Sequence, residues 1–154
     1  MTERYKKSTE LLRRSLKVIP TGSQTFSKSY TQYPVGLSPL FLDRGKGGRV
    51  WDVDGNEYVD LISGLLPIVL GYCDPDVDDA IKRQLQKGII FSLPSILETE
   101  LAEKLIRLIP CAEMVRFGKN GTDATSAAIR LARAYTGKDQ VIALGYHGWQ
   151  DWYV

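Results

Sequence analysis

Cysteine, histidine and long apolar runs are scarce in this sequence of 154 residues, and each shortage excludes a class of protein. Cys73 and Cys111 are the only cysteines, and their wide separation predicts neither a disulfide framework nor a zinc site. The longest apolar stretch, residues 65–70, is too short to cross a membrane. The charged residues 1–7 lack the apolar core of a signal peptide. We therefore expect a soluble cytoplasmic protein with two reduced thiols.

An excess of charge of one sign is also missing. Lys and Arg number 20 against 18 for Asp and Glu, which gives a formal net charge of +2, and the basic residues are scattered. This balance argues against nucleic acid and against an anionic membrane as partners. The composition, 44% hydrophobic and 25% charged, is that of an ordinary globular protein, and the length alone predicts one domain.

The first sixty residues predict a helix followed by a meander of strands. Residues 4–18 place apolar side chains near helical spacing, and Pro20 ends that pattern. Beyond an irregular stretch the hydrophobic period changes to two. Asp54-Gly55 is typical of a tight hairpin turn in which both residues have positive φ. The predicted antiparallel strands are residues 40–42, 50–53 and 57–61.

The next segment predicts two helices with recognisable starts. Asp74 followed by Pro75 is typical of a helix N-terminus. Ser95 and Glu98 form the capping box of a second helix, which ends before Pro110. We expect the first of these helices to bury an apolar stripe formed by Val77, Ala80, Ile81 and Leu85.

A third helix, residues 122–135 closed by Gly137, lies between two short apolar runs. Residues 114–117 and 141–144 are predicted strands, and the order strand, helix, strand predicts a right-handed unit with parallel strands. A parallel sheet needs more strands and covered faces. We therefore expect these residues to be part of a longer chain.

The turn before the third helix is a candidate phosphate cradle. Asn120, Gly121 and Thr122 lead into the helix, whose N-terminus offers backbone N–H groups and the positive end of the macrodipole. Gly121 lets a ligand approach the backbone closely, and Thr122 adds a hydroxyl donor. Neither a Walker loop nor a dinucleotide fingerprint is present. The alternative is that Asn120 simply caps the helix.

A second candidate lies after residues 141–144, at the carboxyl end of a predicted strand, where open α/β sheets bind ligands. Tyr146 or His147 could stack there on a planar heteroaromatic ring. His147 is the only histidine and no ligand cluster accompanies it, so no metal site is predicted. The alternative for His147 is a structural, hydrogen-bonded role.

Several segments in one order closely resemble the class III aminotransferases, and the nearest branch is that of glutamate-1-semialdehyde 2,1-aminomutase and its relatives. The resemblance covers nearly the whole chain, more loosely over residues 1–35. The segments that carry it are WDVDGNEYVD (residues 51–60), residues 98–110, EMVRF (113–117), NGTDA (120–124), AIRLARAYTG (128–137) and YHG (146–148).

This resemblance implies an α/β protein of the pyridoxal 5'-phosphate (PLP) fold type I. Residues 1–61 would belong to the small domain, and residues 62–154 would begin the large PLP-binding domain with its parallel or mixed sheet. The resemblance also implies an amino donor, an oxo acceptor and a homodimer. Residues 62–72 and 88–95 are candidate interface segments, with an ordinary core strand as the alternative; the apolar cluster comprises Leu65, Leu66, Ile68 and Val69.

The family's cofactor-binding positions match Asn120, Gly121, Thr122, Asp123, Tyr146 and His147. Asn120 replaces the serine of the family's phosphate motif, and Asp123 replaces its usual glutamate. Tyr146 would stack on the pyridine ring. The family's Schiff-base lysine, and the aspartate that pairs with the pyridine nitrogen, would lie beyond Val154. We therefore expect no catalytic residue in this segment and no transamination by it alone.

Two departures from the aminomutases favour an aminotransferase. Lys28 stands where the aminomutases have an arginine that contacts the substrate carboxylate, and lysine lacks the bidentate fork. Leu65 takes the place of a tryptophan near the cofactor. An aminomutase-type isomerase remains the alternative. Two further hypotheses stay open: an inactive fragment that acts as an interaction module, and a nucleotide-binding protein, against which the missing fingerprints count.

Overall fold

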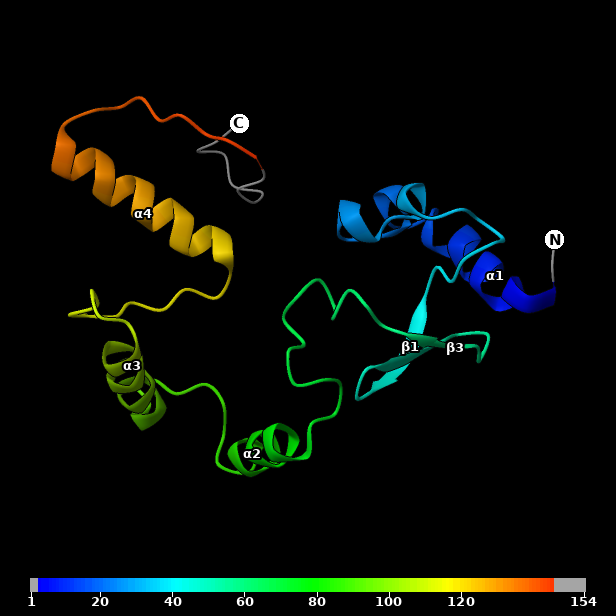
Figure 1. Cartoon of the computed structure of the whole chain (residues 1–154), viewed down its shortest axis with the longest axis horizontal. Helices are drawn as coiled ribbons and strands as arrows, with labels where there is room; N and C mark the ends of the chain where they lie inside the picture. Colours follow the sequence, from blue (N-terminus) through cyan, green and yellow to red (C-terminus); the bar gives the residue numbers. More distant parts are fainter. Residues whose placement is uncertain (1–2, 146–154) are drawn as a thin grey trace. The chain divides into compact units, whose positions relative to one another are not determined.

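The computed structural model describes residues 3–145 (Figure 1). The chain divides between residues 89 and 90 into two compact units. The predicted boundary between the small and the large domain, after residue 61, concerns the complete protein and stays a prediction. In chain order the elements are η1 (Glu3–Tyr5), α1 (Lys6–Ser15), η2 (Pro20–Gly22), η3 (Phe26–Lys28), η4 (Tyr30–Gln32), β1 (Leu42–Lys46), β2 (Arg49–Asp52), β3 (Glu57–Val59), α2 (Pro75–Leu85), α3 (Ile96–Leu108) and α4 (Gly121–Thr136).

The predicted meander is confirmed as a three-stranded antiparallel sheet in the order β1-β2-β3, but its first strand is Leu42–Lys46 and not residues 40–42. Its second hairpin is not the predicted two-residue turn: β2 ends at Asp52, β3 begins at Glu57, and only Gly55 in the loop has positive φ, at +90°. The cause is Asp52, whose carboxylate accepts hydrogen bonds from the N–H groups of Asp54 at 3.0 Å and Asn56 at 2.8 Å. The loop therefore folds around the Asp52 side chain.

The predicted N-terminal helix is confirmed as α1, and the hairpin loop caps it. Asp54 accepts hydrogen bonds from the backbone N–H of Lys7 at 2.6 Å and of Ser8 at 2.9 Å, and from Ser8 Oγ at 2.6 Å. Lys7 and Ser8 are the second and third residues of α1, whose N–H groups have no partner inside a helix. The buried hydrophobic residues of this unit include Tyr5, Leu12 and Val50.

Removing the Asp54 carboxylate should loosen α1. Partial burial raises the pKa of Asp54, but the hydrogen bonds from Ser8 and Lys7 outweigh it and hold that pKa below its ordinary value. A carboxylate with a lowered pKa stabilises the folded state above its unfolded pKa, and the contribution is lost as pH falls. Asp54→Ala should cost about 1–2 kcal/mol in the local stability of α1.

Hydrogen exchange at the Lys7 and Ser8 amides measures this effect. Their exchange should accelerate about tenfold in Asp54→Ala, and acidification should accelerate exchange in the wild type more than in the variant. Equal exchange in the two proteins would contradict the capping role.

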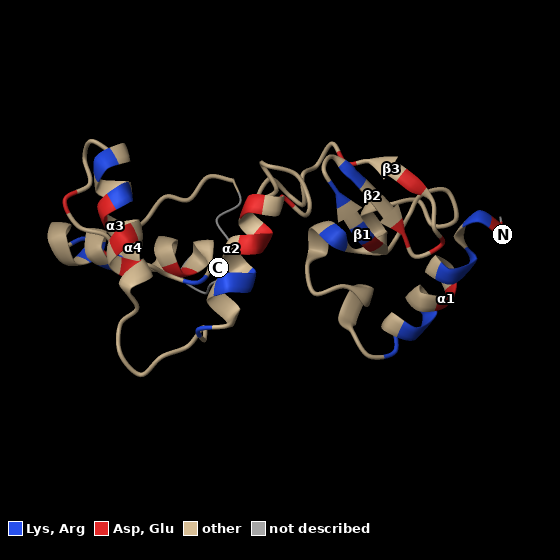
Figure 2. Cartoon of the chain, turned by 90° about the horizontal axis from the view of Figure 1, so that it is seen from below, with Lys and Arg blue, Asp and Glu red and all other residues tan. Residues whose placement is uncertain are grey.

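The starts of α2, α3 and α4, and the ends of α3 and α4, agree with the predictions. The Asp74 side chain accepts from the N–H groups of Asp76 and Val77, both at 3.1 Å, with Pro75 as the first helical residue. Figure 2 shows acidic residues on the first half of α2 and basic residues on the second, as the helix dipole favours. Ser95 caps α3, and Gly137 closes α4 with φ of +67°. No helix among residues 3–145 is long and apolar enough to cross a membrane.

The predicted apolar stripe of α2 is present in the sequence but is not buried. Ile81 is 53% exposed and Leu85 56%, Val77 and Ala80 are exposed as well, and α2 contains no buried residue. A stripe is buried only when another element covers it closely, and no described element covers this one.

The predicted strands 114–117 and 141–144 do not form, although the helix between them does. A parallel strand exists only through backbone hydrogen bonds to its neighbours. The described residues supply no such neighbour to either segment, since the one sheet they contain is the β1-β2-β3 meander. The predicted parallel unit is therefore wrong as a feature of residues 3–145.

Candidate functional site

The turn that leads into α4 is fixed by an acidic side chain of the helix itself. The Asp123 carboxylate accepts hydrogen bonds from the backbone N–H of Asn120 at 2.8 Å and of Lys119 at 3.0 Å. Asn120 lies at the N-cap with an extended backbone, and the helix begins at Gly121. Asp123 therefore holds the predicted cradle, residues 120–122, in a defined conformation at the positive end of the helix.

The space over Gly121 is open. A Cβ built on this glycine meets no heavy atom within 4 Å, and its φ is not in the left-handed region. Gly118 contrasts with it, because a Cβ there would lie 2.8 Å from the Asp123 Cβ. Nothing in the described chain requires glycine at residue 121, but a ligand that approaches the helix N-terminus would. A phosphate dianion fits this donor set.

Of the other predicted cofactor residues, only some lie in the part of the chain that the structure describes. Thr122 is the second residue of α4, so its hydroxyl and N–H belong to the same turn as Gly121. Tyr146 and His147 lie outside the described residues, and their stacking role stays a prediction. Within residues 3–145 no group of three His, Cys, Asp or Glu side chains could hold a metal ion.

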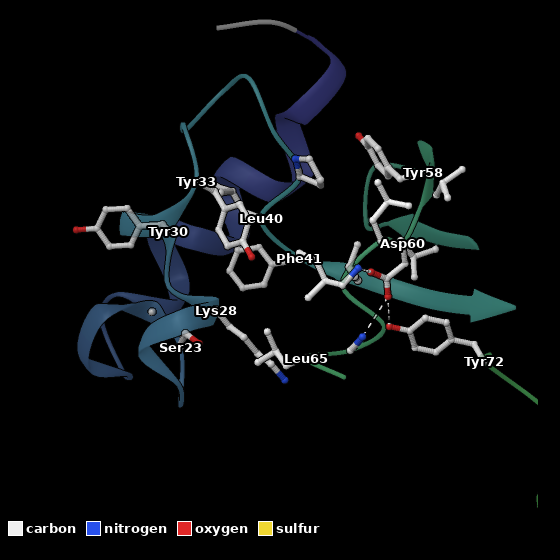
Figure 3. A pocket seen from close by; sticks show the side chains of 18 of the residues that line it. Ser23, Lys28, Tyr30, Tyr33, Leu40, Phe41, Tyr58, Asp60, Leu65 and Tyr72 are labelled. Carbon is white, nitrogen blue, oxygen red and sulfur yellow. Dashed lines mark hydrogen bonds between the residues drawn. The ribbon is translucent and has the colours of Figure 1, made fainter. Parts of the chain in front are cut away.

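A second candidate site is a cavity of about 610 Å³ within the unit of residues 1–89 (Figure 3). Its wall is mainly apolar and aromatic, as small-molecule sites commonly are. Lys28 is the only Lys or Arg among the described residues that line it, and Figure 3 shows its side chain directed toward Leu65. The larger side chains of the wall include Tyr30, Tyr33, Leu40, Phe41, Tyr58 and Leu65.

The structure thus brings together Lys28 and Leu65, which the sequence singled out separately. Lys28 ends η3 and is exposed, and its ammonium makes no ion pair with any described residue. The next residue, Ser29, is fully buried and donates from Oγ to the Thr21 carbonyl at 3.2 Å. Ser29 therefore anchors the segment that carries Lys28, and sequence reasoning missed it because its partner lies eight residues away.

Part of the cavity wall comes from the segment of residues 60–72, which Asp60 organises, through Asp60, Leu61, Ile62, Gly64, Leu65 and Tyr72. The Asp60 carboxylate accepts from three consecutive backbone N–H groups, of Ile62, Ser63 and Gly64, and from the Tyr72 hydroxyl. The bond from Tyr72 lowers the pKa of Asp60, and the same bond raises the pKa of Tyr72. Sequence reasoning missed both residues, since no local pattern marks a carboxylate that bonds twelve residues ahead.

The comparison with known families gives one clear match. The profile of the family described as Aminotransferase class-III matches residues 30–152. The 3-aminobutyryl-CoA aminotransferase of Cloacimonas acidaminovorans is 45% identical over 157 residues, covering 100% of this chain and 38% of that protein. The glutamate-1-semialdehyde 2,1-aminomutase 2 of an Exiguobacterium species is 42% identical over 153 residues, covering 98% of this chain and 35% of that protein.

Solved structures agree with the family profile. The omega-transaminase of Sphaerobacter thermophilus superposes with a TM-score of 0.85 and 33% identity, covering 97% of this chain and 34% of that one. A structure described as a transaminase with PLP bound gives a TM-score of 0.82 and 34% identity, covering 94% of this chain and 34% of that one. This chain therefore spans little more than a third of the proteins it resembles, with the same fold over that part.

Proposed function

This chain belongs to the class III aminotransferase family and shares the PLP fold type I of its transaminases, and on that premise we propose that it forms part of a PLP-dependent aminotransferase. The observation that carries the proposal is the open turn over Gly121 at the N-terminus of α4, where the family holds the cofactor phosphate. Bound PLP supplies the electron sink that amino-group transfer requires. The complete enzyme would transfer an amino group from a donor to an oxo acceptor.

The residues of this chain would bind and orient the cofactor. The backbone N–H groups of Gly121 and Thr122, with the Thr122 hydroxyl, would hold the phosphate, and Asn120 would contribute from the N-cap. Asp123 would keep the turn in place through its bonds to Asn120 and Lys119. Tyr146 would stack on the pyridine ring, with His147 beside it. No residue of this chain is assigned to covalent catalysis.

The cavity lined by Lys28 and Leu65 is the proposed site for the amino substrate. The Lys28 ammonium, which makes no ion pair with a described residue, would favour a molecule with a negatively charged group on an apolar body. Lysine acts here as a single point charge, so the recognition would be less directional than that by an arginine.

Turnover by the complete enzyme tests the proposed function and separates it from isomerisation, which the aminomutase relative at 42% identity makes the second candidate. Purified protein is loaded with PLP and mixed with 3-aminobutyryl-CoA or with glutamate-1-semialdehyde. An aminotransferase needs a second, oxo compound to complete its cycle, whereas an aminomutase returns its product without one. Absence of both activities in a PLP-loaded enzyme would favour the inactive interaction module.

Replacing Lys28 should weaken substrate binding without affecting PLP. Loss of a hydrogen bond to a charged group costs about 1.5–3 kcal/mol, so Lys28→Ala should lower kcat/KM for an anionic donor by about 10- to 150-fold. Lys28→Arg keeps the charge and should recover most of the loss. Lys17→Ala, which removes a lysine outside the cavity, is the matched control. Equal losses for anionic and neutral donors would contradict the assignment.

We also propose that the complete enzyme is a homodimer in the cytoplasm. Residues 62–72 belong to no strand of the sheet, and Leu66 and Val69 are 79% and 83% exposed, which supports the interface over the core-strand alternative. Residues 88–95 are also apolar and exposed at Ile90. Such surfaces favour a permanent interface. The exposed free thiols Cys73 and Cys111 suit a reducing compartment. Light scattering of the complete protein measures the assembly.

A further inference from the structure

Asp60 accepts hydrogen bonds from the backbone N–H groups of residues 62–64 and from the Tyr72 hydroxyl, and these bonds are here called the Asp60 clasp. We propose that the Asp60 clasp positions Leu65 in the wall of the substrate cavity and thereby sets substrate selectivity. The kinetic part of this proposal rests on the proposed aminotransferase function. The structural part, that the clasp holds residues 62–66, concerns this chain alone.

Asp60 uses both carboxylate oxygens on one short segment. Oδ1 accepts from the N–H of Ile62 at 2.8 Å and of Ser63 at 3.1 Å. Oδ2 accepts from the N–H of Gly64 at 3.2 Å and from the Tyr72 hydroxyl at 2.7 Å. One carboxylate therefore ties three successive amides to a side chain at the far end of the loop. Figure 3 shows the Tyr72 hydroxyl bonded to the Asp60 carboxylate.

Tyr72 is itself fixed on the meander. The Tyr72 backbone N–H donates to the Gly47 carbonyl at 2.9 Å, and the Gly47 N–H donates to the Tyr72 carbonyl at 2.8 Å. Its ring lies so close to Gly45 that a Cβ there would stand 2.4 Å from the ring. Only glycine at residue 45 permits this contact. The Tyr72 side chain is therefore held in a fixed position on the sheet, and its bond to Asp60 fixes the loop to the sheet.

The loop needs such a restraint because its backbone is strained. Ser63, Gly64, Leu65 and Leu66 have φ of +51°, +62°, +69° and +79°. Left-handed conformations are unfavourable for residues with a Cβ, and three of the four are not glycine. Strain of this kind persists only where surrounding contacts over-determine it, and it concentrates at functional sites. Here the strained conformation of residues 63–66 places Leu65 in the cavity wall with Lys28.

Tyr72→Phe is the decisive variant, because it removes the hydroxyl and keeps the ring against Gly45. Hydrogen exchange of the peptide covering residues 61–66 should accelerate about fivefold or more in the complete enzyme. The ratio of kcat/KM for a bulky donor to that for a small donor should change about fivefold or more, since Leu65 is released. The PLP dissociation constant should stay within about twofold.

Two further variants provide a second disruption of the clasp and a control outside it. Asp60→Asn replaces one acceptor oxygen with an NH2 donor, which leaves at least one backbone N–H of the loop without an acceptor, so it should accelerate exchange at residues 61–66 at least as much as Tyr72→Phe. Ser8→Ala removes a buried hydroxyl whose partner, Asp54, lies outside the loop, so it should leave both exchange at residues 61–66 and the selectivity ratio unchanged.

The outcomes separate the two proposals. Unchanged exchange in Tyr72→Phe overturns the clasp, whatever the enzyme catalyses. Faster exchange with an unchanged selectivity ratio overturns the positioning role, because the bond would then be only structural. A wild-type enzyme that transfers no amino group overturns the proposed function, and the exchange measurement still decides whether the clasp exists.

Discussion

Gly121→Leu is expected to lower PLP affinity by about 100-fold or more while the protein remains folded. A Cβ at this position meets no described heavy atom within 4 Å, so the backbone of the turn tolerates a side chain there. A leucine would occupy the volume in which the phosphate approaches the backbone N–H groups of Gly121 and Thr122. Loss of two hydrogen bonds to a charged group, each contributing about 1.5 kcal/mol or more, gives this magnitude.

Titration of the apo-enzyme with PLP, followed by absorbance, measures the effect, and the melting temperature reports on folding. Thr122→Ala removes one hydroxyl donor and should weaken binding by about 10- to 150-fold. Gly48→Leu is the matched control, because that glycine also has open space and an ordinary φ but lies in the meander. If Gly121→Leu and Thr122→Ala both bind PLP as the wild type does, the cofactor site is assigned to the wrong turn.

Asp52→Ala is expected to destabilise the N-terminal unit by about 3 kcal/mol or more. Asp52 is 2% exposed, and its carboxylate accepts from two backbone N–H groups, from Asn56 Nδ2 at 2.9 Å and from the Tyr58 hydroxyl at 2.9 Å. Alanine would leave these donors without a partner in a buried place, which costs more than the bonds themselves contribute.

Urea unfolding followed by tryptophan fluorescence measures this loss, because Trp51 lies beside Asp52 in β2. Asp43→Ala is the matched control: Asp43 is exposed in β1 and should change the free energy of unfolding by less than about 0.5 kcal/mol. A loss of under about 1 kcal/mol in Asp52→Ala would show that water replaces the carboxylate as the acceptor for these donors, and it would contradict the expected role of Asp52 as their buried acceptor.

The predictable features of this chain are those decided by residues within one turn of each other. Asp74, and Ser95 with Glu98, place helix starts correctly because a cap and its N–H partners lie two or three residues apart. The start of α4 after Asn120 was predictable for the same reason, whereas the phosphate-binding role of this turn stays a prediction. The strands at 114–117 and 141–144 were not, because pairing partners decide whether an extended segment becomes a strand.

The cavity could not be derived from the sequence pattern. Its wall combines residues from Leu12 to Tyr72, and Lys28 and Leu65 were singled out by resemblance rather than by any local motif. The Asp60 clasp joins positions twelve residues apart, and the Asp54 cap joins positions 46 and 47 residues apart. Contacts at such separations depend on the tertiary fold, and sequence periodicity carries no signal for them.

The Asp54 cap has a consequence for the order in which this chain acquires its shape during synthesis. A helix of ten residues is too short to persist by itself in water. Residues 6–15 are therefore translated some 46 residues before the carboxylate that completes the N-terminus of their helix. Until then residues 6–15 remain open to chaperones and proteases. A stall or truncation before residue 54 would release a helix sequence with nothing to fold upon.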